Sequence, residues 1–449
     1  MNQVEQTAVV PEPNGKYTLD VSSWTETASC PSCRRFVPAR AEIRNGYRYV
    51  RKYCPFEQQG FESLVNKVDE PSVELSPRQG SPSFRPPVGT REEDVTEARI
   101  PNIEACQNLI LHLTPRCNST CPVCYDRYLY GRHEMSTEEA KALIRRVTHK
   151  QVVLFGGEPT VRQDLPELIR YIRSTGNWPA LCTNGLRLAN RAYLRELVDA
   201  GLAVTYLSFD GFREEIYERM RGGRHEYRLK LAALENLEQE RAPTGLSYTV
   251  ARGINDDQMG LMLDYIRDHP FVWELGMRPL YLPGVDADAG MGAQELLTRQ
   301  ELNRLVTRHV GFDPAYFTWW YEAKVAWLAW LRDRFPRLMQ GRFNVPEPDQ
   351  MFLRRDGRTL KPLLDLGLLI RLTHALRARR ADPVVVHPTV LRLALAVLQG
   401  HVRPVEIEQR LREMGVVRTV QGITRLPEDT LSSDRILALF HTGRGNILP

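Results

Sequence analysis

The chain has 449 residues, of which 42% are hydrophobic and 26% charged, so it is long enough for about three domains and too apolar to be largely disordered. Its 60 basic and 55 acidic residues leave a net charge of only +5, which gives no indication of a nucleic-acid partner. No apolar run approaches the ~18 residues of a transmembrane helix, and the N-terminus lacks the pattern of a signal peptide, so a cytoplasmic location is expected.

Residues 1–68 are predicted to form a small domain built around three cysteines. Cys30 and Cys33 form a Cys-x-x-Cys pair, and Cys54 follows a stretch, 47–50, whose residues suggest a short hairpin. Such close pairs favour metal ligands in a reducing cytoplasm over a disulfide framework. The sequence therefore predicts a zinc-ribbon or rubredoxin-like knuckle that could bind zinc or iron, with a metal-free knuckle as the alternative.

Residues 69–105, rich in Pro, Ser, Arg and Glu, are predicted to be a linker, and residues 106–285 alternate apolar strands with helices. The predicted strands are 109–114, 151–155, 179–183, 203–209, 246–251 and 274–281. The predicted helices between them are 137–148, 165–174, 190–200, 226–240 and 257–268. This alternation predicts an α/β fold, with a parallel sheet that forms an open or partial barrel of six units.

Residues 286–449 are predicted to be almost wholly helical. The stretch 315–335 is unusually aromatic, and its Trp320, Trp327 and Leu331 share one helical face. That spacing favours packing in a core over contact with a substrate or a membrane. Further helices are predicted at 362–378, 387–399 and 405–414.

A triplet of cysteines is the strongest chemical signal. Cys117, Cys121 and Cys124 stand on the loop that directly follows the first predicted strand of the barrel. Three thiolates on one loop can each bind one iron of a [4Fe-4S] cluster and leave the fourth iron open to a small molecule. A zinc site with these three cysteines and a further ligand is the alternative. Cys106 and Cys182 are expected to be ordinary buried thiols.

The ends of the next four predicted strands carry glycine or polar residues. Ligands of parallel sheets bind at the carboxyl ends of the strands, so we expect these residues to lie on one rim beside the cysteine triplet. Each segment alone is also compatible with an ordinary turn. The candidate residues are Gly156, Gly157, Glu158, Thr183, Asn184, Ser208, Asp210, Arg252 and Asn255.

With these motifs the sequence resembles the radical S-adenosylmethionine (radical SAM) superfamily over about residues 106–285. The resemblance lies in the Cys-x3-Cys-x2-Cys loop, the GGEPT segment and the strand spacing. It implies a partial (β/α)6 barrel with a [4Fe-4S] cluster on Cys117, Cys121 and Cys124, whose open iron is chelated by SAM. It further implies that Gly156, Gly157 and Glu158 hold the methionine amino end, Ser208 and Asp210 lie near the ribose, Arg252 or Asn255 near the carboxylate, and Tyr125 near the adenine.

The resemblance also implies the reaction class. A radical SAM enzyme, of transferase or oxidoreductase type, takes an electron from a donor such as flavodoxin or ferredoxin. It cleaves SAM to a 5′-deoxyadenosyl radical, which abstracts hydrogen from an unactivated carbon. The run that ends YTVARGINDDQMG resembles a subgroup that includes archaeal tetraether lipid synthases and a pterin C-methyltransferase. That subgroup implies C–C bond formation or C-methylation of a small-molecule or lipid-like substrate.

Two other functions remain as alternatives: a peptide-modifying radical SAM enzyme, and a non-catalytic iron–sulfur or interaction protein. The intact cysteine triplet and GGEP segment argue against the second. The chain departs from the subgroup at the N-terminal knuckle, where Glu57 stands in place of the usual histidine. The fourth ligand of that site is therefore left open.

Overall fold

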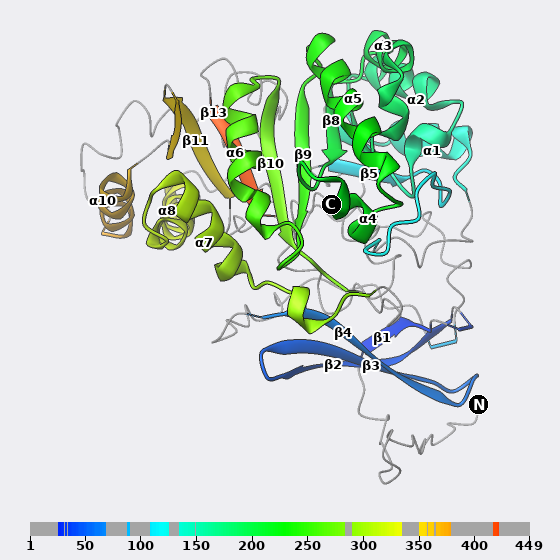
Figure 1. The fold of residues 1–449 in the computed structure, drawn as a ribbon, viewed down its shortest axis with the longest axis horizontal. Coiled ribbons are helices and arrows are strands. Elements are labelled where there is room, and N and C mark those ends of the chain that lie inside the picture. Colours follow the sequence, from blue (N-terminus) through cyan, green and yellow to red (C-terminus); the bar gives the residue numbers. More distant parts are fainter. Residues whose placement is uncertain are drawn as a thin grey trace.

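The computed structural model contains two β-sheets, a small one near the N-terminus and a large one that carries most of the helices (Figure 1). The structure describes residues 26–30, 32–33, 35–68, 88–89, 108–124, 134–148, 150–282, 290–334, 350–356, 358–362, 365–378 and 416–421. Cys106, Tyr125, most of the predicted linker 69–105 and the predicted helices 387–399 and 405–414 lie outside these residues.

The small sheet is an antiparallel meander. Its strands, in spatial and chain order, are β1 (Glu26–Ser29), β2 (Phe36–Arg44), β3 (Tyr47–Cys54) and β4 (Gln59–Lys67). The hairpin expected around 47–50 is β2–β3, and its turn residues Asn45 and Gly46 both have positive φ, 52° and 75°. An Asn-Gly turn of this kind matches the right-handed twist of the two strands it joins.

Six parallel strands form one side of the large sheet, from β10 to the edge strand β5, as predicted. They are β5 (Asn108–His112), β6 (Gln151–Phe155), β7 (Trp178–Thr183), β8 (Val204–Ser208), β9 (Thr244–Val250) and β10 (Val272–Pro279). Each pairs in parallel with the next along the chain. Their carboxyl ends therefore meet at one edge of the sheet, where the sequence places its candidate residues.

Helices follow the strands and cover one face of this sheet. They are α1 (Thr137–Ile144), α2 (Leu165–Ser174), α3 (Arg191–Asp199), α4 (Glu214–Met220), α5 (His225–Gln239) and α6 (Met259–Asp268), of which α4 was not predicted. Alternate strand residues separate the two faces: Leu109 and Leu111 join the core under the helices, whereas Ile110 joins a smaller apolar cluster with Val153 and Trp273. The short 3-10 helices are η6 (Pro159–Val161), η7 (Leu186–Ala189), η8 (Asp256–Gln258) and η10 (Ala293–Glu295).

The described part of the region 286–449 contains strands, which were not predicted, besides helices. Its described helices are α7 (Arg299–Val310), α8 (Ala315–Arg334) and α10 (Leu366–Arg377), and its described strands are β11 (Gln350–Asp356), β12 (Thr359–Pro362) and β13 (Val416–Gln421). β13 pairs in parallel with β10, and β11 lies antiparallel between β13 and β12. These three strands extend the sheet to nine strands. Sequence periodicity did not predict them, because β13 pairs with strands that are distant from it along the chain.

The aromatic stretch in α8 packs in the core, as its spacing predicted. Tyr316, Phe317 and Trp320 are almost fully buried, and the rings of Tyr316 and Trp320 are stacked with an interplanar angle of 8°. Among the described helices, none combines the length and the apolar character needed to cross a bilayer.

The small sheet is joined to the large one by direct contacts. The amide of Leu282, just past β10, donates to the carbonyl oxygen of Val65 in β4 at 2.8 Å. The ammonium group of Lys67 lies 3.0 Å from the carboxylate of Glu301 in α7. The N-terminal sheet is thus fixed below the large sheet in Figure 1.

Candidate active site

The cysteine loop after β5 packs directly on the loop after β6. The amide of Gly157 donates to Thr114 O at 2.7 Å, and the amide of Glu158 donates to Arg116 O at 2.8 Å. A Cβ atom on Gly156 would lie 2.5 Å from Thr114 O, and one on Gly157 would lie 2.5 Å from Arg116 O. The paired glycines are therefore needed here to admit the backbone of the cysteine loop.

All three cysteines of the triplet are free and partly buried in this loop. The amide nitrogen Nδ2 of Asn184 lies 3.8 Å from the Cys117 sulfur, and the Ser119 hydroxyl lies 3.0 Å from the Cys121 sulfur. Burial is the main cause that raises the pKa of the Cys117 thiol to about 11. Iron binding must therefore displace a proton from this thiol, as metal binding to cysteine generally does.

The two sets of three cysteines differ in how closely their sulfurs gather. Two thiolates on one tetrahedral zinc lie about 3.8 Å apart, given a Zn–S bond of about 2.3 Å. Among the described residues, the one group of three such ligand atoms within 4.8 Å of one another is Cys30, Cys33 and Cys54. The triplet does not form such a group, and a cluster in which each thiolate binds a different iron does not require one.

Glu158 ties the ends of two strands together. Its side chain is buried, and Oε1 accepts hydrogen bonds from the hydroxyls of Thr160 at 2.6 Å and Thr183 at 2.7 Å. Its Oε2 accepts from the backbone amide of Asn184 at 2.7 Å. The carboxylate that was expected to receive an amino group thus holds the loop after β6 against the end of β7.

Asp210 and Asn255 make the corresponding link between β8 and β9. Both are fully buried, and the Asn255 amide group donates to the backbone oxygens of Asp210 at 2.9 Å and Thr249 at 2.8 Å. The Asp210 carboxylate accepts two hydrogen bonds from the Arg221 guanidinium, at 2.6 and 2.9 Å. The expected ribose and carboxylate residues therefore form a buried network around the strand ends.

Lys230 was missed by the sequence analysis although it completes this rim. Its ammonium group donates to Asn184 O at 2.6 Å and to Ser208 O at 2.8 Å, so it joins the ends of β7 and β8. Lys230 is fully buried, and burial is the main cause that lowers its pKa. A lysine four residues after Glu226 in a helix is typical of an exposed ion pair. No local signal in the sequence distinguishes such a pair from a buried lysine.

Arg252 faces another part of the molecule. Its guanidinium pairs with Glu301 at 2.7 Å, and the same carboxylate binds Lys67 of the small sheet. The structure brings the other described rim residues together and gives Arg252 a contact between domains. Tyr125, expected near the adenine, lies outside the described residues.

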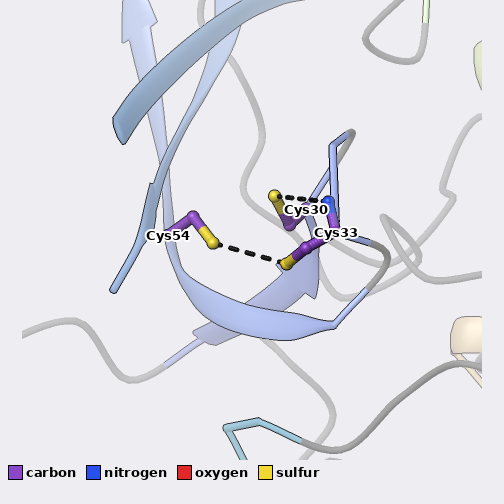
Figure 2. Close-up of side chains that lie close together, drawn as sticks. All are labelled: Cys30, Cys33 and Cys54. Carbon is purple, nitrogen blue, oxygen red and sulfur yellow. Dashed lines mark hydrogen bonds between the residues drawn. The ribbon is translucent and has the colours of Figure 1, made fainter. Parts of the chain in front are cut away.

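The N-terminal cysteines form a compact group (Figure 2). The sulfurs of Cys33 and Cys54 lie 3.5 Å apart, and the amide of Cys33 donates to the Cys30 sulfur at 3.5 Å. Burial is the main cause that raises the pKa of Cys54 to about 12. This spacing fits three thiolates around a single zinc or iron ion, whereas the side chain of Glu57 is exposed.

Comparison with known families identifies the large sheet. Residues 111–266, which span the cysteine triplet and β5 to α6, match the family model of the radical SAM superfamily. The chain carries a radical SAM domain. It is an enzyme, and members of this superfamily use a [4Fe-4S] cluster and SAM as cofactors.

Two curated proteins are similar to parts of the chain. The 7,8-dihydro-6-hydroxymethylpterin dimethyltransferase of Methanocaldococcus jannaschii is 29% identical over 259 residues, which are 54% of this chain and 49% of that protein. The Fe-coproporphyrin III synthase of Methanosarcina barkeri is 34% identical over 172 residues, 37% of this chain and 40% of that protein. The chain thus spans about half or less of the length of these relatives.

Solved structures resemble this chain only distantly. The structure of native anSMEcpe with bound AdoMet is 17% identical, covers 51% of this chain and 66% of its own, and superposes with a TM-score of 0.36.

Proposed function

We propose that the chain catalyses reductive cleavage of SAM and uses the resulting 5′-deoxyadenosyl radical to abstract hydrogen from an unactivated carbon. The observation that carries this proposal is the contact between the cysteine loop and the GGEPT loop, at the edge of the sheet where the strands end. The similarity to the pterin dimethyltransferase favours C–C bond formation or C-methylation of a small-molecule or lipid-like substrate.

The residues of the chain would act chiefly by holding and shielding. Cys117, Cys121 and Cys124 would hold the cluster, which when bound supplies one electron to SAM. Glu158 fixes the GGEPT loop, so the methionine end of SAM would meet the backbone of that loop, with Asn184 beside Cys117. The buried pairing of the other rim residues keeps water from the strand ends, as a radical reaction requires.

Two further assignments belong to this proposal. An external one-electron donor such as flavodoxin or ferredoxin would reduce the cluster, and Cys30, Cys33 and Cys54 would hold one zinc or iron ion. All seven described cysteines are free thiols, which supports a reducing, cytoplasmic location.

Anaerobic reconstitution tests the reaction. After loading with iron and sulfide, the chain is mixed with dithionite and SAM, and 5′-deoxyadenosine and methionine are quantified. We expect both products from the wild type and from Cys182→Ala, and none from Cys121→Ala. Cys182 is the matched control because it is a buried thiol on β7 outside the cysteine loop. A wild-type chain with an intact cluster that forms no 5′-deoxyadenosine would refute the proposal.

Deuterium transfer tests the substrate class. Deuterated 7,8-dihydro-6-hydroxymethylpterin, a deuterated isoprenoid lipid and a deuterated peptide are each added to the reduced enzyme. We expect deuterium in 5′-deoxyadenosine from the pterin or the lipid. Transfer from the peptide alone would instead favour a peptide-modifying enzyme.

A further inference from the structure

One cysteine of the triplet has a distinct buried environment. Three buried charged side chains, Lys230, Asp210 and Glu226, lie near Cys121, and the partly exposed Arg221 pairs with Asp210 at 2.6 Å. The Asp210 carboxylate is bound by Arg221, whereas Glu226 accepts a hydrogen bond from Ser119 of the cysteine loop.

Ser119 connects this environment to the sulfur itself. Its hydroxyl oxygen lies 3.0 Å from the Cys121 sulfur and 2.5 Å from Glu226 Oε1. A hydroxyl has a single hydrogen, so Ser119 can donate to only one of these two acceptors at a time. Once Cys121 is a thiolate ligand it has no hydrogen of its own to offer, and the two acceptors then compete for the hydrogen of Ser119.

Cys117 has different surroundings. The Asn184 amide nitrogen lies 3.8 Å from its sulfur, farther than the Ser119 hydroxyl lies from the Cys121 sulfur. Hydrogen bonds to cluster sulfurs and local charge are two of the factors that set the reduction potential of an iron–sulfur cluster. Electron density in the reduced cluster would therefore be stabilised on the Cys121 side.

We propose that Ser119 is a positioning residue that raises the reduction potential of the cluster through Cys121, and that Glu226 opposes it by competing for the hydrogen of Ser119. This inference rests on the proposed function, because it requires that the triplet hold a cluster. Reduction adds one electron to the cluster from the external donor and breaks no bond at Cys121.

The test is the midpoint potential of the reconstituted cluster, measured without SAM by a redox titration followed by electron paramagnetic resonance. Ser119→Ala should lower the ratio of reduced to oxidised cluster at a fixed potential by about tenfold, which corresponds to about 59 mV for one electron. Glu226→Gln should raise that ratio, because the weaker acceptor leaves the Ser119 hydrogen to the sulfur and a negative charge is lost.

Ser247→Ala is the matched control. It removes a hydroxyl that bonds Arg278 at 2.7 Å on the neighbouring strand, and its potential should equal that of the wild type. Loss of packing alone would shift the midpoint potential of Ser119→Ala and of Glu226→Gln in the same direction. Shifts in opposite directions therefore support the inference. If Ser119→Ala and Glu226→Gln shift the midpoint potential equally, or do not shift it, this inference is overturned while the proposed function stands. A wild-type chain that assembles no [4Fe-4S] cluster overturns both.

Discussion

The carboxylate of Glu301 offers a direct test of how the small sheet is held to the barrel. It binds Lys67 of β4 at 3.0 Å and Arg252 at 2.7 Å, and it accepts the Thr298 amide at 2.7 Å in the capping box of α7. Burial acts to raise the pKa of Glu301, but these three partners outweigh it and lower the pKa from 4.5 to about 2. We predict that Glu301→Gln destabilises the chain at neutral pH.

The size of the effect follows from the shift. A change from 4.5 to about 2 corresponds to about 3 kcal/mol, because each pKa unit is about 1.4 kcal/mol. The side chain is 24% exposed and its partners are also partly open to solvent, so screening reduces the expected loss to about 1–2 kcal/mol.

The direction of the pKa shift determines how the stabilisation by Glu301 changes with pH. The pKa is lower in the folded chain, so this stability is present above pH 4.5 and is lost as the pH falls toward 2. At pH 3.5 the difference between wild type and Glu301→Gln should be roughly two fifths smaller than at pH 7. Urea unfolding followed by tryptophan fluorescence at both pH values measures it. A difference that does not change between pH 7 and pH 3.5 would refute the assignment to the ionised carboxylate.

Three further predictions concern the strand ends and the knuckle. Gly157→Ala should lower the amount of iron bound after reconstitution several-fold, because the added Cβ would displace the cysteine loop at Arg116. The control Gly276→Ala should bind as much iron as the wild type, because the nearest atom to its Cβ is 3.5 Å away. Iron and sulfide analysis of the reconstituted variants measures both. Lys230→Met should destabilise the chain by about 2 kcal/mol in urea unfolding, because two buried carbonyl oxygens lose a charged donor; an unchanged midpoint would contradict this role. Cys30→Ser should lose the single zinc or iron ion without loss of the cluster, and metal analysis that shows no such ion in the wild type would disprove the site.

The sequence predicted the central strands because their apolar runs and the intervening helices have strong periodicity. Strand β6 was placed at the observed residues 151–155, and the position of the cysteine loop directly after β5 followed from the same pattern. The gathering of Cys30, Cys33 and Cys54 was also predicted, because Cys-x-x-Cys spacing is a local signal.

What the sequence could not predict depends on tertiary pairing. Asp210 and Glu158 were expected to face a ligand, yet each binds partners supplied by other strands or helices. Glu226 and Lys230 look like solvent-facing residues of α5, yet both are buried, Glu226 against Ser119 of the cysteine loop and Lys230 against the ends of β7 and β8. Strand β13 was missed because its pairing with β10 spans most of the C-terminal half of the chain.

The close contact between the cysteine loop and the GGEPT loop has a consequence for the order of assembly. The two loops share backbone hydrogen bonds. A side chain on Gly156 or Gly157 would clash with the backbone of the cysteine loop, so the contact depends on both glycines. A ligand that orders one loop therefore also orders the other. By thermodynamic linkage, binding of the cluster and binding of SAM would each raise the affinity of the chain for the other ligand. Such positive cooperativity would favour SAM on the cluster-loaded chain and disfavour it on the apoprotein.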